Sequence, residues 1–186
     1  MESEPTPVLW MLVLCVPFLL LLGSATRWVT RGELLVVTRR GVIVRRHVGR
    51  RRPGPVVRVP LVERTHLLPA GDHDVLAAAR VTTRDGDDVR VLATARGRLV
   101  PPETGRRFVD PRAVAADAVE TALGRVVADL ATDDVAAALA DADLLAGVAR
   151  EADRAARPAG VELHALELDE IELLLRPRVP RRVGSR

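Results

Sequence analysis

The chain has no lysine, asparagine, glutamine or tyrosine, and it has only two phenylalanines and two tryptophans among 186 residues. Every basic side chain other than histidine is therefore an arginine, a bias typical of genomic base composition. Trp10, Phe18 and Trp28 fall in an apolar run, which leaves Phe108 as the one aromatic available to stack on bases. We therefore expect no nucleic-acid partner.

Catalytic side chains are equally scarce. Serine occurs only at Ser3, Ser24 and Ser185, and the single cysteine, Cys15, lies in the apolar run. The folded part thus has no Ser or Cys nucleophile, and no Gly-rich phosphate loop is present. His73 with Asp72 and Asp74 is the best metal candidate, but polar residues on a strand surface are the favoured interpretation. We predict a non-enzymatic protein without a catalytic site, metal or cofactor.

Residues 8–28 form the long apolar run and are predicted to be a transmembrane helix behind a short acidic tail, residues 1–7. In a helix, Trp10 and Trp28 would lie about 27 Å apart at ~1.5 Å per residue, one in each membrane interface. No arginine precedes the run and several follow it. The positive-inside rule then places the N-terminus outside and the folded domain in the cytoplasm, anchored by a single pass.

Pro17 and the N-terminal charge leave alternatives open. Pro17 either kinks a spanning helix or bends it into a hairpin that enters and leaves one leaflet. Cleavage as a secretory signal is the weaker interpretation, because the N-terminus is acidic and Gly23-Ser24-Ala25 is a loose match to a cleavage site. An extracytoplasmic ligand-binding module, anchored or secreted, is therefore the alternative function.

A basic collar follows the apolar run: residues 27–64 hold eleven arginines against Glu33 and Glu63. Arginines this close to an anchor would contribute on the order of 1 kcal/mol each beside an anionic leaflet. We predict that seven of them contact lipid headgroups: Arg39, Arg40, Arg45, Arg46, Arg50, Arg51 and Arg52. A solvated strand face is the alternative.

Beyond the anchor the pattern predicts an α+β domain over residues 30–175. Residues 34–38 and 42–48 read as a hairpin split by Arg39-Arg40-Gly41, and two further strands flank an Asp-Gly turn. Asp110-Pro111 begins a helix of about twenty residues. Two shorter helices follow, for which Thr132-Asp133-Asp134 and then Asp141 or Asp143 are the expected caps. A closing strand with a phase shift near Leu166 ends the domain. Residues 176–186 form a basic, proline-containing tail.

These segments occur in the order found in a known family. The chain resembles the stomatin, prohibitin and flotillin group, the SPFH or band 7 domain, in "GELLVVTRRGVIVRRHVGRRRPGPVVRVPLVERTHLLPAG", "VTTRDGDDVRVLATARGRLV", "FVDPRAVAADAVETALGRVVADLATDDVAAAL" and "READRAARPAGVELHALELDEIEL". The stomatin-like (slipin) branch is the most similar. Pro177 and Pro180 stand where that branch continues into a coiled coil, so large-ring assembly is in doubt.

The resemblance implies a function beside the bilayer. It implies a membrane-anchored scaffold that self-associates, binds membrane lipids, organises microdomains and regulates neighbouring membrane proteins. The partners that it implies are anionic lipids, other copies of the chain, and a membrane protease or an NfeD-type membrane protein.

Overall fold

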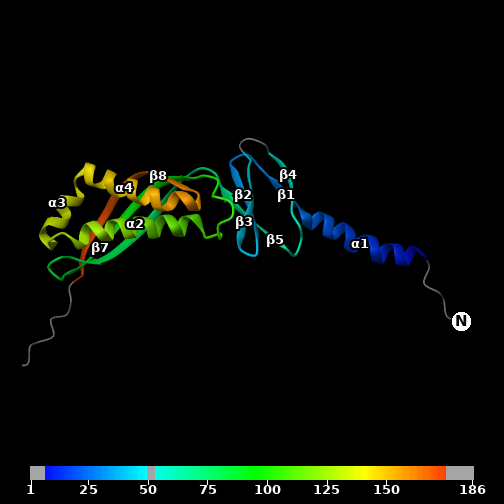
Figure 1. The fold of residues 1–186 in the computed structure, drawn as a ribbon, viewed down its shortest axis with the longest axis horizontal. Coiled ribbons are helices and arrows are strands. Elements are labelled where there is room, and N and C mark those ends of the chain that lie inside the picture. Colours follow the sequence, from blue (N-terminus) through cyan, green and yellow to red (C-terminus); the bar gives the residue numbers. More distant parts are fainter. Residues whose placement is uncertain (1–6, 50–52, 175–186) are drawn as a thin grey trace, which may run out of the picture. The chain divides into compact units, whose positions relative to one another are not determined.

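The computed structural model describes residues 7–49 and 53–174, which divide into two compact units. Unit 1 comprises Met1–Gly71 with Leu99–Phe108, and unit 2 comprises Asp72–Arg98 with Val109–Arg186. Both units are shown in Figure 1. The predicted mixed α+β class is confirmed. Most of the predicted acidic tail and the whole basic tail lie outside the described residues.

Unit 1 begins with one helix and is otherwise built from strands. They are α1 (Pro7–Ala25), β1 (Thr26–Val29), β2 (Glu33–Arg39), β3 (Val42–Val48), β4 (Gly54–Val57) and β5 (Glu63–Pro69). Strand β2 lies between β3 and β5 and is antiparallel to both, while β1 pairs with β4. The predicted hairpin of β2 and β3 is confirmed. Strands β1 and β5 were not predicted.

Strand β2 is central because its side chains are apolar on both faces. Leu35 and Val37 pack with Val29 and Val56 on one face. On the other face, Leu34 and Val36 pack with a second set, Ile43, Val48, Leu68, Ala70 and Phe108. A strand covered on both faces reads as a continuous apolar run, which is what the sequence shows.

Helix α1 differs from the predicted anchor. It runs through Pro17 but ends at Ala25, so the prediction of a helix to Trp28 is wrong. The physical reason is pairing: Trp28 lies opposite Pro55 in the β1–β4 ladder, and Val29 is buried beyond it. Arg58 holds the helix end through its guanidinium, which donates to the Ser24 carbonyl at 2.9 Å. Within the part of the chain that the structure describes, no helix is both long enough and apolar enough to cross a membrane.

Unit 2 is a three-stranded sheet with helices on one side. Its strands are β6 (Asp72–Thr82), β7 (Asp88–Leu99) and β8 (Val161–Leu174), in the order β6-β7-β8. Helices α2 (Pro111–Ala128) and α4 (Ala142–Ala156) lie side by side over the sheet (Figure 1), and α3 (Val135–Leu139) connects them. Short 3₁₀ turns, η1 (Thr132–Asp134) and η2 (Arg157–Ala159), precede α3 and β8.

The predicted helix starts are confirmed by their caps. The Asp110 carboxylate accepts from the Arg112 N–H at 3.0 Å, with Pro111 as the first helical residue. The Asp141 carboxylate accepts from the Asp143 N–H at 2.9 Å. Each cap satisfies an N–H that has no partner within its helix.

Two other local predictions have different outcomes. The phase shift in β8 is confirmed, since Leu163 and Leu166 are both buried although they are three residues apart. Of the expected cap Thr132-Asp133-Asp134, Asp134 is the N-cap residue of α3 but makes no side-chain cap hydrogen bond, and Thr132 is used elsewhere. Its hydroxyl donates to the Asp87 carboxylate at 3.0 Å, and its N–H donates to Asp85 at 3.1 Å. The Asp-Gly turn between β6 and β7 is thereby tied to the helical segment.

Candidate functional site

The three predicted anchor residues lie on two different elements. Pro17 is exposed within α1, and Trp28 is 67% exposed on β1. Trp10 belongs to α1, but its side chain is outside the described residues. The structure therefore does not place the two indoles at opposite ends of one helix.

The predicted arginine collar is divided between the two faces of the β3-β2-β5 sheet. Arg45 and Arg46 are neighbours on β3 and so point to opposite faces. Arg45 forms an ion pair with Glu63 at 2.6 Å. Arg46 donates to the backbone carbonyls of Pro101 and Pro102 at 3.3 and 2.8 Å. Both side chains thus have partners within unit 1.

The Glu63 carboxylate has a hydrogen bond and an ion pair on its face of the sheet. The Val59 N–H donates to its carboxylate at 2.8 Å and is the main reason that the pKa of Glu63 lies below its ordinary value. The charges of Arg45 and Arg39 act in the same direction. This carboxylate is therefore engaged with groups on one side of β5.

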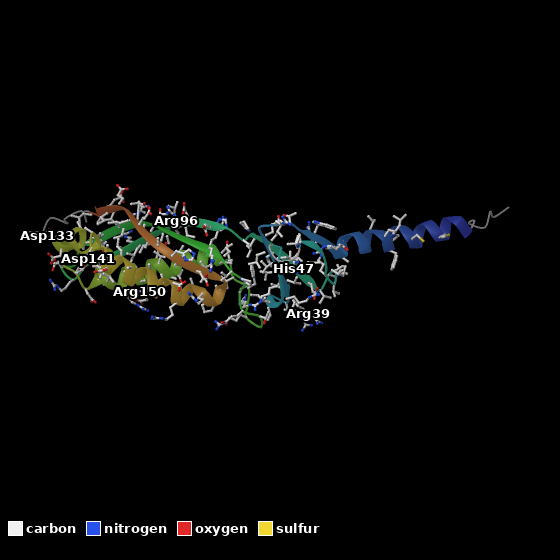
Figure 2. The ribbon with its side chains drawn as sticks, turned by 90° about the horizontal axis from the view of Figure 1, so that it is seen from above. Arg39, His47, Arg96, Asp133, Asp141 and Arg150 are labelled. Carbon is white, nitrogen blue, oxygen red and sulfur yellow. The ribbon has the colours of Figure 1, made fainter. Side chains whose placement is uncertain are left out.

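The remaining collar arginines are distributed as follows. Arg39 is exposed at the end of β2, where Figure 2 labels it at the surface of unit 1. Arg40 is exposed in the turn to β3 and has a positive φ of 52°. Arg50, Arg51 and Arg52 lie outside the described residues. The described collar residues thus do not share one surface.

A different group of basic residues gathers around a hollow of about 520 Å³ in unit 1, called here the Arg40 hollow. Its volume is within the range of roughly 300–1,000 Å³ typical of small-molecule sites. Three arginines and one histidine line it, and no lining residue is acidic: Thr38, Arg40, Gly41, Leu61, Val62, Arg64, His66, Arg107 and Phe108.

The wall of the Arg40 hollow is held in place by stacking and hydrogen bonding. The His66 ring stacks on Phe108 with their centroids 3.9 Å apart and an interplanar angle of 21°. Thr38, which is buried, lies with its hydroxyl 3.3 Å from His66 Nε2 and donates to the Arg64 carbonyl at 3.4 Å. Which of the two groups donates in the Thr38–His66 hydrogen bond depends on the tautomer of the His66 ring.

Two causes lower the pKa of His66 below its ordinary value. Burial is the larger one, and the positive charge of Arg64 is the second. Arg46 also lies on this face of the sheet, because both it and His66 are opposite Val36 in register. His66 is consequently neutral at neutral pH, and the hollow has its positive charge from the arginines.

The lowered pKa of His66 predicts a loss of stability on acidification. The unfolded chain has the ordinary histidine pKa of about 6.5, so it binds more protons than the folded chain just below that pH. The free energy of unfolding should therefore fall as pH drops below about 6.5 and through the folded pKa. Thermal unfolding of the full chain between pH 5 and 8, compared with His66→Asn, measures this difference.

A second variant separates the two causes. Arg64→Gln removes the charge but leaves the burial, so an NMR titration should show a higher pKa of His66 that is still below the ordinary value. An unchanged pKa would contradict the role given to Arg64.

Unit 2 uses its arginines differently. Along β7, Arg98 pairs with Glu162 at 2.5 Å, Arg96 with Asp74 at 3.3 Å and Arg90 with Glu172 at 3.2 Å. Figure 2 shows Arg96 on the sheet side of this unit and Arg150 on the helix side. The arginines of β7 are thus neutralised by carboxylates of the same sheet.

The metal candidate of the sequence is not assembled by the fold. Asp72 and Asp74 are two residues apart on β6 and share a face, whereas His73 points to the other face. Among the described residues, no group of three His, Cys, Asp or Glu side chains could hold a metal ion.

Sequence reasoning missed Arg64, His66 and Arg107 as members of one site. The alternation in "ERTHLLP" was available as a signal, because it places Arg64 and His66 on the same face of a strand. Nothing local connects Arg107 with them, since it comes from the segment after β7.

Comparison with known protein families identifies a match over most of the chain. The family model described as SPFH domain / Band 7 family matches residues 28–174. The matched range begins within β1, ends with β8 and includes every residue of the Arg40 hollow. A search of curated proteins found no match to the chain.

Proposed function

Because the chain belongs to the SPFH domain / Band 7 family, whose members are generally non-enzymatic scaffolds associated with membranes, we propose that it is such a scaffold, held at a membrane by α1. The finer assignments are part of the same proposal. They are the stomatin-like branch, the organisation of microdomains, and the regulation of a neighbouring membrane protease or an NfeD-type protein.

The observation that carries the proposal is the exposure of α1. Residues 15–20 are all exposed, and they include Val16, Phe18, Leu19 and Leu20. Consecutive helical residues are about 100° apart, so six of them cover every side of the helix. A helix that is apolar all round is favoured in a protein core or in lipid. The described residues supply no protein core around these side chains, which supports lipid as their environment.

The charge of the two units supports an orientation toward the membrane. Unit 1 has 13 arginines against 5 acidic residues, a net charge of +8, whereas unit 2 has 15 against 20, a net charge of −5. A basic unit joined to the anchor favours an anionic leaflet. We propose the cytoplasmic leaflet, since the arginines follow α1 and none precedes it.

The same charges support self-association. The basic unit of one copy complements the acidic unit of another, and such complementarity favours association that weakens with salt. Exposed carboxylates gather near one end of unit 2, where Figure 2 labels Asp133 and Asp141. Because the two units differ in charge, the contact would be head-to-tail.

Extraction of the full chain into native nanodiscs tests the scaffold. We expect assemblies larger than a monomer at low salt and smaller ones at about 0.5 M salt, where screening is stronger. Mass photometry measures the size. A chain that stays monomeric at every salt concentration would contradict self-association.

Topology is read separately, with one reporter before Met1 and another after Arg186. Opposite sides are expected for a single crossing with the folded domain in the cytoplasm, and the same side for a helix that enters and leaves one leaflet. An external signal from the reporter after Arg186 would favour the alternative function, an extracytoplasmic ligand-binding module.

A further inference from the structure

We propose that the Arg40 hollow binds the terminal phosphate of an anionic phospholipid headgroup, an inference that rests on the membrane association proposed above. The site consists of Arg40, Arg64 and Arg107 around the stacked His66 and Phe108. It differs from the predicted collar, with which it shares only Arg40.

The first argument is uncompensated charge. Among residues 7–49 and 53–174, none of the three arginines has a carboxylate within ion-pair distance, whereas every arginine named above on β7 has one. Glu63, the acidic residue next to Arg64, points to the other face of β5 and is taken by Arg45. A terminal phosphate carries between one and two negative charges and accepts paired hydrogen bonds from guanidinium groups.

The second argument is backbone conformation. In the part of the chain that the structure describes, two residues other than glycine have a positive φ, Arg40 at 52° and Leu61 at 67°. Both line the Arg40 hollow. The left-handed region is sparsely populated for such side chains, and such residues gather at binding sites because the surrounding structure must impose them.

The third argument is the apolar rim, which favours a lipid over a free phosphate. Leu61 is 102% exposed and Val62 is 43% exposed, although both are large apolar residues. They lie beside the arginines in the lining of one hollow. Apolar side chains next to cations match the boundary between acyl chains and headgroups, where both kinds of contact are made by one ligand.

Protonation of His66 changes the charge of the Arg40 hollow. Protonation of the His66 ring adds a positive charge and a hydrogen-bond donor to the lining of the hollow. The positive charge of Arg64 opposes this protonation, and the negative charge of a bound phosphate favours it. The pH dependence of binding thus has two opposing contributions, because a terminal phosphate also loses negative charge on acidification.

Titration of the full chain in neutral detergent micelles tests the site. The probes are short-chain phosphatidic acid, short-chain phosphatidylcholine and inorganic phosphate, and calorimetry gives the affinity. We expect saturable binding of phosphatidic acid, no saturation by phosphatidylcholine, and binding of inorganic phosphate at least about tenfold weaker because it lacks acyl chains. Inorganic phosphate that binds as tightly as phosphatidic acid would overturn the lipid assignment.

Two charge-matched variants assign the site to its residues. Arg40→Gln/Arg64→Gln/Arg107→Gln should weaken phosphatidic acid binding on the order of 100-fold, at roughly fivefold for each arginine. Arg27→Gln/Arg31→Gln/Arg106→Gln removes the same charge from exposed positions of the same unit that are neither in the hollow nor among the predicted headgroup contacts, and should change it less than about threefold. Equal losses in the two variants would reduce the site to general electrostatics and overturn it.

A third variant separates lipid binding from phosphate binding, and a membrane assay separates the phosphate site from the anchor. Leu61→Ser should weaken the binding of phosphatidic acid but not of inorganic phosphate, because it changes only the rim. Flotation of both triple variants with vesicles should persist, since α1 is intact. Absence of flotation in the unsubstituted chain contradicts the proposed function, whereas flotation without saturable binding contradicts the phosphate site alone.

Discussion

Replacing both Leu19 and Leu20 of α1 by arginine should release most of the chain from membranes. The two side chains are 64% and 69% exposed, so the substitution leaves no cavity in a protein core. Moving arginine instead of leucine into the centre of a bilayer costs about 3 kcal/mol per residue. Two such changes should lower the membrane-bound fraction more than about 100-fold in vesicle flotation.

The control adds the same charge elsewhere. Leu76 and Leu173 are large exposed apolar residues of unit 2, at 77% and 50% exposure. Leu76→Arg/Leu173→Arg should leave flotation unchanged, because these side chains lie outside the helix proposed to enter lipid. Release of the control variant, or retention of the α1 variant, would contradict the anchoring role of α1.

Gly49→Ala should unfold much of unit 1. A Cβ at this position would lie 1.9 Å from the Thr30 carbonyl oxygen and 3.0 Å from Val29 Cγ1. Thr30 cannot easily move, because its N–H donates to the Glu33 carboxylate at 2.7 Å. Gly49 is itself fixed by donating to the Glu33 carbonyl at 2.9 Å. We expect a loss of about 3 kcal/mol or more in the free energy of unfolding.

Gly71→Ala is the matched control in the same unit. A Cβ at Gly71 meets no atom within 4 Å, so the change should stay within about 0.5 kcal/mol. Hydrogen exchange of the amides of Leu35, Val36 and Val37 reports on unit 1 separately from unit 2. Equal hydrogen-exchange protection in Gly49→Ala and Gly71→Ala would contradict this prediction. It would mean that the residue after β3 can move away from the residue after β1 with no loss of stability.

Much of unit 2 was predictable because its signals are local. The caps at Asp110 and Asp141 are each read from a few neighbouring residues, and the helices that they begin are confirmed. The apolar period of α2 likewise identifies the buried face, with Ala118, Val119 and Ala122 in contact with the core.

The end of α1 was not predictable in this way. Apolar residues continue past Ala25, so the sequence pattern extends the helix to Trp28. What stops it is the pairing of β1 with β4, a strand about thirty residues later in the chain. Local helical preference yields to a backbone ladder that only the folded unit supplies.

The sequence alone determined the α+β class, the β2–β3 hairpin, the main helices, the family and the concentration of arginine behind an apolar segment, because each follows from composition or short-range spacing. Only the tertiary structure decided which arginines share a surface. Strand alternation sends Arg45 and Arg46 to opposite faces, whereas strand pairing and the return of the chain at Phe108 gather Arg40, Arg64 and Arg107 around one hollow. The reason is that register and chain return set distances between residues that the sequence keeps far apart.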